Sequence, residues 1–387
     1  MKTFNRAVQL TLGCLCLLVL GPRSLAAAEP IKIGAILAVT GPASFLGAPE
    51  ARTVEMLAEA LNAKGGIQGR KVELLIKDSA GEPEKAISLA RQLIEEEKVL
   101  AIIGPSTSGE TMKIKAICEQ GKTPLVSCAA AEVIVKPVAR YVFKVAPNDS
   151  HAARKIFAEM QARGLKRIAV LASNTGFGQA GKKQLVDIAP EFGIQILAEE
   201  VYDKGATDLS AVVAKLMANK ELQAVVNWSI EPVQSIIAKN MRQAGWNVPL
   251  FQSHGFANIK YAEAAGAAAE GIIFPAGRLL VAGDLPAGHP QKGLLADYAR
   301  QYEERFKEQA STFGGHGWDA LQLLVAAIEQ GGAERDKVRD ALEKTAGFAG
   351  IGGVFTFSAE DHGGLALDAF EMLTVKQGRF VPYVREK

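Results

Sequence analysis

The sequence is poor in cysteine, histidine and aromatic residues, and neither sign of charge dominates it. It has four Cys, five His and 6% aromatic residues, and its 44 Lys and Arg against 42 Asp and Glu give a formal charge of +2. So few Cys exclude a scaffold held together by disulfides. So few His disfavour a metal-rich or haem enzyme, and the balanced charge provides no basic footprint for nucleic acid.

The chain does have length and apolar content. Its 387 residues exceed the roughly 100–200 residues of a typical domain, and 48% of them are hydrophobic against 22% charged. This composition excludes a disordered chain. Two folded lobes are expected, because a single hydrophobic core rarely grows this large.

The first 28 residues have the pattern of a secretory signal peptide. Lys2 and Arg6 precede an apolar run over 7–20, and small residues stand at 26–28. That run is shorter than the ~20 residues that span a bilayer, which argues against a membrane anchor. We expect export to the periplasm, cleavage near Ala28 and a mature chain that does not span the membrane. Removal of the leader leaves 41 basic against 42 acidic residues, a formal charge of −1.

Only Cys118 and Cys128 remain in the mature chain. Cys118 lies near the end of a helix expected over 109–120, and Cys128 follows the far end of a strand expected over 123–127. About four strand rises, roughly 13 Å, would separate them, more than the ~7 Å between Cα atoms that a disulfide bridges. The sequence predicts two free, buried thiols.

Short apolar runs typical of buried strands alternate with helical periodicity, and the alternation restarts once along the chain. Strands are expected at 31–37, 71–78, 99–103, 124–127 and 141–145, and then at 167–172, 194–201, 224–227, 249–251 and 271–274. This pattern predicts an α/β fold class with two doubly wound parallel-sheet lobes.

The remainder from residue 276 is mostly helical and too short for a third domain. It must add to both lobes, so the chain crosses between them more than once. After the signal peptide at 1–28, the expected division is 29–146 plus 276–355 for lobe 1 and 147–275 plus 356–387 for lobe 2.

Ligands of open parallel sheets bind outside the carboxyl ends of the strands, and hydroxyl side chains follow the strand at 99–103. Ser106, Thr107 and Ser108 stand where a helix opens, so they and the free backbone N–H groups could hold a small anion such as a carboxylate. Thr107 and Glu110 also fit a capping box, which uses the same geometry. Both interpretations stay open.

Small residues follow the strand at 124–127. Ala129, Ala130 and Ala131 would let a ligand approach the backbone, or would simply pack a tight turn. Single aromatic or polar residues also stand near strand ends, namely Trp228, His254 and, more loosely placed, Trp318.

The segment 173–181 contains a literal G-x-G-x-x-G, with Glu199 farther along the chain. This favours a rival hypothesis, an NAD-dependent oxidoreductase. Against it, three residues separate the strand from the first glycine, where the fingerprint requires an immediate turn. An exported protein also meets no nicotinamide pool.

Catalytic motifs are otherwise missing from the sequence. There is no G-x-S-x-G, S-x-x-K or H-E-x-x-H, and the five His have no metal-ligand spacing. We expect no enzyme activity, no metal and no cofactor.

Seven runs in the mature chain carry a family resemblance. They are Ile31–Gly34, Thr40–Pro42, Leu61–Leu74, Ala101–Ser106, Pro124–Ser127, Gly205–Ser210 and Ala269–Gly271. In this order they resemble periplasmic solute-binding proteins of the leucine/isoleucine/valine-binding type (class I). The resemblance implies two lobes joined by a three-crossover hinge, closure on a ligand, and delivery by a monomer to the permease subunits of an ABC importer in the inner membrane.

The resemblance also assigns a ligand site. In family members that bind amino acids, a Ser matching Ser108 and a Thr matching Ala131 hold the ligand carboxylate, and an acidic residue matching His254 faces the ammonium. The side-chain pocket corresponds to Leu46, Phe177, Ile230 and Phe313, with Trp228 close by. The complete expected site is Leu46, Ser106, Thr107, Ser108, Ala129, Ala130, Ala131, Phe177, Trp228, Ile230, His254 and Phe313.

The exchange of an acid for His254 is informative about the ligand. An ammonium in a closed cleft needs a counter-charge, which a His does not supply. We therefore expect a carboxylate without an amine: an aromatic acid, or an aromatic or branched 2-oxo acid. The alanine triplet and the His-Gly pair resemble the branch that binds benzoate-like and phenyl-oxo acids. Branched-chain amino acid binding stays the alternative, and signalling to a receptor is not distinguished from transport.

Overall fold

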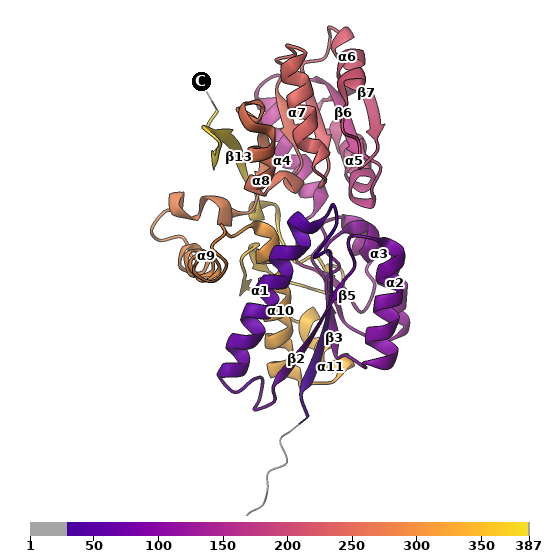
Figure 1. The fold of residues 1–387 in the computed structure, drawn as a ribbon, viewed down its shortest axis with the longest axis vertical. Coiled ribbons are helices and arrows are strands. Elements are labelled where there is room, and N and C mark those ends of the chain that lie inside the picture. The colour runs from indigo at the N-terminus through magenta and orange to yellow at the C-terminus, as the bar shows by residue number, and fades with distance from the viewer. Residues whose placement is uncertain (1–28, 386–387) are drawn as a thin grey trace, which may run out of the picture.

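The computed structural model describes residues 29–385, and they form two lobes stacked end to end (Figure 1). The expected signal peptide at 1–28 lies outside the described residues. Within 29–385, no helix has the length and apolar character needed to cross a membrane. Cys118 and Cys128 are both buried and free, as predicted.

Lobe 1 is built on a parallel sheet of order β2-β1-β3-β4-β5. Its strands are β1 (Ile31–Leu37), β2 (Val72–Asp78), β3 (Ala101–Ile103), β4 (Leu125–Ser127) and β5 (Val142–Lys144). Its helices are α1 (Ser44–Ala63), α2 (Pro83–Arg91), α3 (Ser108–Gln120), α10 (Thr312–Gly331) and α11 (Arg335–Glu343).

The apolar run of β1 shows why this sheet needs helices on both faces. Ile33, Ala35 and Leu37 belong to the core that α1 and α10 share with the sheet, whereas Ile36 belongs to the core beneath α2 and α3. A strand buried on both sides is continuously apolar rather than alternating.

Lobe 2 is built on a sheet of order β14-β13-β10-β9-β8-β6-β7. Its strands are β6 (Arg167–Ser173), β7 (Gln195–Tyr202), β8 (Ala224–Trp228), β9 (Leu250–Gln252), β10 (Ile273–Ala276), β13 (Glu371–Lys376) and β14 (Arg379–Pro382), and its helices are α4 (Asp149–Ala162), α5 (Gly176–Ile188), α6 (Ser210–Ala218), α7 (Val233–Gln243) and α8 (Ile259–Ala265). β6 to β10 pair in parallel, and β13 adds antiparallel to β10. The predicted α/β fold with two parallel-sheet lobes is confirmed, with an antiparallel hairpin added at one edge.

The chain crosses between the sheets three times. The crossings follow β5, follow β10 and precede β13. Between the second and third lie α9 (Lys292–Phe306), which packs through Tyr298 and Tyr302 near Met56 of α1, and the small hairpin of β11 (Phe348–Ala349) and β12 (Val354–Phe355).

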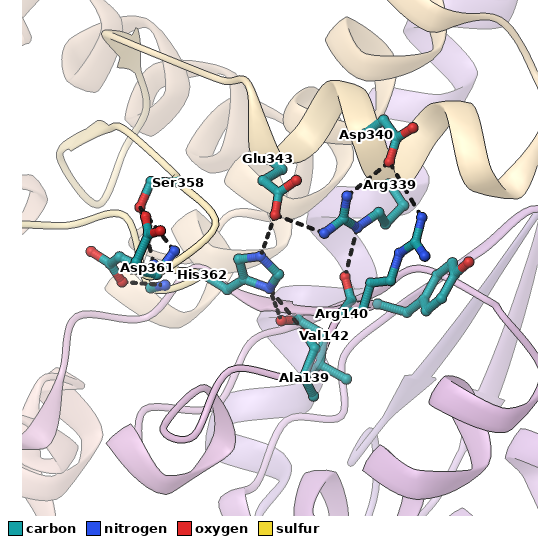
Figure 2. A network of polar contacts seen from close by, with 12 residues as sticks. Ala139, Arg140, Val142, Arg339, Asp340, Glu343, Ser358, Asp361 and His362 are labelled. Atoms are coloured by element: carbon teal, nitrogen blue, oxygen red, sulfur yellow. Dashed lines mark hydrogen bonds and ion pairs between the residues drawn. The ribbon is translucent and has the colours of Figure 1, made fainter.

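The segment 356–366 packs on lobe 1, and residues 367–370 after it reach lobe 2, where Phe370 joins an apolar cluster. Phe357 and Leu365 share the core of β1. The ring of His362 stacks on that of Phe143 in β5, with 4.0 Å between the ring centroids. Its Nδ1–H donates to the carbonyls of Ala139 (3.0 Å) and Val142 (2.9 Å) (Figure 2). We therefore propose that lobe 2 resumes near residue 371, later than the boundary at 356 expected from the sequence.

Helix α10 begins earlier than its apolar pattern indicates. The sequence suggests a helix from Trp318, but α10 starts at Thr312, where Ser311 Oγ accepts a hydrogen bond from Gly314 N–H. The glycines at 314, 315 and 317 weaken the helical signal, because glycine is a poor helix former. The longer helix carries Phe313 and His316 to the junction of the lobes.

Candidate functional site

The two lobes touch at the N-termini of α3 and α5. A Cβ added to Gly176 of α5 would lie 2.7 Å from the Cα of Gly109 in α3, so the two backbones approach closely at a pair of glycines. Asn258 Nδ2 of lobe 2 also donates to the Phe45 carbonyl of α1 at 3.1 Å. The lobes are therefore closed on one another.

A cavity of about 270 Å³ lies beside this contact; we call it the seam cavity. Lobe 1 contributes Pro42, Ala43, Ala80, Gly81, Pro83, Thr107 and Gly109 to its lining, and lobe 2 contributes Asn174, Thr175, Gly176, Phe177, Lys204, Ile230 and Glu231. Three residues expected in the site, Thr107, Phe177 and Ile230, line it.

The three expected hydroxyl groups have different partners. Ser106 Oγ donates to the buried Glu50 carboxyl and accepts from Ala38 N–H (3.0 Å). Thr107 caps α3 in the predicted capping box, its Oγ1 donating to Glu110 Oε2 at 2.6 Å. Ser108 Oγ accepts from Ala131 N–H at 3.3 Å, and within residues 29–385 no acceptor takes its O–H. Ser108 is therefore the hydroxyl free to donate to a ligand oxygen.

Burial explains how Ser106 is held in place. Glu50 is fully buried, and this burial raises the pKa of its carboxyl well above the usual range. The hydroxyl of Ser106 is thus occupied by Glu50 and Ala38, and it stabilises the loop before α3. The sequence, by contrast, predicts that Ser106 contacts the ligand.

The alanine loop lies directly against the start of α3. Ala129 N–H donates to Ser127 Oγ (3.1 Å), and Ala131 N–H donates to Ser108 Oγ. Ala130 packs in the apolar cluster described next. The structure therefore brings the loop at 129–131 and Ser108 together, as the resemblance implies.

Six expected site residues belong to one apolar cluster, which extends from the core of lobe 2 to residues of lobe 1 at the junction of the lobes. They are Leu46, Ala130, Phe177, Trp228, Ile230 and Phe313. Leu46, Ala130 and Phe313 come from lobe 1, and the other three come from lobe 2. Elements far apart in the sequence therefore form one apolar surface in the cleft.

His254 sits within an aromatic enclosure. Its ring centroid lies 5.3 Å from Phe177, 5.7 Å from Trp228 and 5.3 Å from Phe370. Burial, aided by the nearby charge of Lys144 and by His316, lowers the pKa of His254 to about 3. The imidazole is neutral at neutral pH, and neither ring nitrogen has a hydrogen-bond partner among the described residues.

Sequence reasoning missed two residues beside His254. His316 and Phe370 line a small second cavity together with His254, Phe313 and Pro147. The sequence contains both, but His316 lies in a glycine-rich stretch and Phe370 lies in the last crossover. Only the closed arrangement of the lobes and crossovers brings them to His254.

The glycine motif at 176–181 has a packing explanation. A Cβ at Gly178 would meet the Ser173 carbonyl at 2.1 Å, and one at Gly181 would meet the Trp228 indole at 1.9 Å. Glu199, the expected ribose ligand of the dinucleotide hypothesis, is paired with Lys182 at 2.8 Å. Close packing therefore accounts for these glycines without a dinucleotide.

In residues 29–385, no three His, Cys, Asp or Glu side chains form a group that could hold a metal ion.

The two cleft histidines give the stability of the protein a defined pH dependence. Burial, aided by the charge of Lys144, lowers the pKa of His316 to about 3, as for His254. In the unfolded chain a His has a pKa of about 6.5, so below that pH the unfolded state binds protons that the folded state does not. When the pH falls from 7 to 5, each histidine should therefore lower the free energy of unfolding by about 2 kcal/mol. Urea unfolding at both pH values should show that His316→Leu loses about 2 kcal/mol less than the wild type; an equal loss would contradict this account.

The comparisons with known proteins support the two-lobed α/β fold. The family of periplasmic binding proteins matches residues 30–378. The "Leu/Ile/Val-binding protein homolog 3" of Brucella melitensis is 24% identical over 92% of this chain and 94% of its own. The crystal structure of an extracellular ligand-binding receptor from Rhodopseudomonas palustris HaA2 is 28% identical with a TM-score of 0.86, over 92% of this chain and 99% of that one.

A further solved structure carries a ligand. The branched-chain amino acid transporter substrate binding protein LivJ from Streptococcus pneumoniae, in complex with isoleucine, is 25% identical with a TM-score of 0.80, over 91% of this chain and 97% of that one. Since the family match spans nearly all of the described residues, the chain belongs to the periplasmic binding protein family.

Proposed function

We propose that the protein captures a small carboxylate that lacks an amine and encloses it between its lobes. The ligand is an aromatic acid, or an aromatic or branched 2-oxo acid. The mature protein works in the periplasm as a monomer, without a cofactor, and delivers the ligand to the permease subunits of an ABC importer. The observation that carries this proposal is the neutral, unpaired His254 in its aromatic enclosure.

The carboxylate end of the ligand is anchored at the opening of α3. The free O–H of Ser108, the positive end of the helix and the backbone of the alanine loop converge there. The apolar cluster around Phe177 then takes the rest of the ligand. An uncharged apolar body with one carboxylate matches both halves of this site.

An amine would be poorly matched beside His254. A buried ammonium without a counter-charge costs several kcal/mol or more, and a neutral imidazole supplies no charge. The alternative, a branched-chain amino acid as the names of the relatives suggest, would need another acid. Glu231 lines the seam cavity and is the candidate, but its Oε2 already accepts from Ser229 Oγ (2.8 Å) and Ile230 N–H (3.2 Å), and Lys204 lines the same cavity.

Calorimetry on protein that has been unfolded, freed of ligand and refolded tests the proposal. Benzoate, cinnamate, phenylpyruvate and benzoylformate are titrated beside leucine and NADH. We expect at least one amine-free acid to bind with a Kd near or below about 10 μM and leucine to bind at least about 100-fold more weakly. Micromolar leucine binding with no response from the acids would refute the proposal, and NADH binding would revive the dinucleotide hypothesis.

A further inference from the structure

The second cavity lies where the three crossovers meet; we call it the hinge cavity. Pro147, Gly277 and Phe370, one from each crossover, line it together with His254, His316 and Thr312. Its volume is about 20 Å³. That is room for about one water-sized group.

Two residues that line this small space, His254 and His316, have ring nitrogens without a hydrogen-bond partner among the described residues. His254 Nδ1, His254 Nε2 and His316 Nδ1 have no hydrogen-bond partner in residues 29–385, although both side chains are only 7% exposed. A buried polar atom left without a hydrogen bond destabilises the folded protein, so three such atoms on residues beside one cavity call for a partner. Thr312 does not provide one, because its Oγ1 donates to the Ala257 carbonyl at 3.4 Å.

The chemistry of two neutral imidazoles defines that partner. A neutral imidazole offers one N–H donor and one acceptor nitrogen. A hydroxyl group donates one hydrogen bond and accepts others, so it can pair with both rings at once. Lys144, fully buried near both rings, adds positive potential that favours an electron-rich oxygen over a cation.

Phe177 is a side chain that lines the seam cavity and also contacts a residue of the hinge cavity. It lines the seam cavity beside Thr107 and Gly109, and its ring meets the His254 ring edge-on at 5.3 Å. A ligand whose carboxylate is at Ser108 and whose ring packs on Phe177 would therefore point its far end toward His254 and His316.

We propose that His254 and His316 form a distal subsite that binds a hydroxyl group at the end of the ligand opposite its carboxylate. This inference rests on the proposed function and narrows it to hydroxylated aromatic acids. His316 is then a specificity-determining residue, although it is absent from the site expected from the sequence.

Calorimetry with three acids of one scaffold tests the subsite. 4-Hydroxybenzoate is compared with benzoate and with 4-methylbenzoate, which fills similar space without a polar group. The wild type should bind the hydroxy acid at least about tenfold more tightly than either comparison acid. His316→Leu should reduce this ratio to about threefold or less and change benzoate affinity little, and His316→Gln should restore part of it.

Thr312→Val is the matched control, since it changes the same cavity wall at a hydroxyl that is bonded elsewhere. It should keep the wild-type ratio. A wild-type ratio near one, or a His316→Leu variant that keeps the full ratio or weakens all three acids equally, would overturn the subsite while leaving the proposed function standing. If leucine binds and no acid does, the proposed function fails and the subsite fails with it.

Discussion

Replacing His254 with glutamate should invert the preference of the cleft for its ligand. The new carboxylate would be enclosed by Phe177, Trp228 and Phe370, where it supplies the counter-charge that an ammonium needs. An acid without an amine would instead share the closed cleft with the new carboxylate, and nothing on the ligand would compensate that buried negative charge. In calorimetry, phenylpyruvate binding should weaken by about 100-fold, and leucine binding should become measurable.

His254→Gln is the control, because glutamine is neutral and can still donate and accept hydrogen bonds. The affinity of this variant for phenylpyruvate should stay within about tenfold of the wild type, and it should not bind leucine measurably. The role assigned to His254 is wrong if the Glu variant binds phenylpyruvate as the wild type does and still ignores leucine.

Gly176→Ala should weaken ligand binding by hindering closure of the lobes. The added Cβ would lie 2.7 Å from the Cα of Gly109, a backbone atom that cannot rotate away. The lobes would have to separate, which exposes the ligand to water and penalises the closed state. We expect the affinity for whichever acid binds best to fall by about 100-fold, with the radius of gyration in solution scattering shrinking less on ligand addition.

Gly109→Ala is the matched control on the other side of the same contact. Its Cβ would lie 3.8 Å from the nearest atoms, an ordinary van der Waals distance. This variant should bind like the wild type. If Gly176→Ala and Gly109→Ala bind the acid with equal affinity, the contact between the two glycines does not limit closure of the lobes.

Much of the fold is predictable from local patterns. The strand β1 spans 31–37 as its apolar run indicates, and the capping box of Thr107 and Glu110 forms as their spacing requires. Such features depend on neighbours within a few residues, which sequence reading captures well. The place of 356–366 on lobe 1 depends on distant partners such as Phe143, so no local pattern reveals it.

The candidate site was predictable only where a strand end or a family motif marks it. Ser108 and the alanine loop follow strands and lie together in the structure. The partner of Ser106 is Glu50, a residue on α1 that no spacing rule connects to it. His316 was not predicted as a site residue, because glycines weaken the helical pattern around it and its neighbour His254 is on the other lobe.

The literal G-x-G-x-x-G shows how a motif can mislead without its structural context. Its glycines do begin a helix after a strand, as the fingerprint requires. Their lack of a Cβ serves the approach of Gly109 and the packing of Trp228 instead. The space available to a side chain at Gly176 and Gly181 is limited by the other lobe and by β8. These distant neighbours, and not a bound dinucleotide, explain why glycine stands there.

The most direct test of the central claim is to compare phenylpyruvate with phenylalanine on ligand-free refolded protein by calorimetry. The two molecules share a ring and a carboxylate and differ in an oxo group against an ammonium group. The neutral His254 predicts that phenylpyruvate binds at least about 100-fold more tightly. Equal binding, or tighter binding of phenylalanine, would contradict a cleft built for carboxylates that lack an amine.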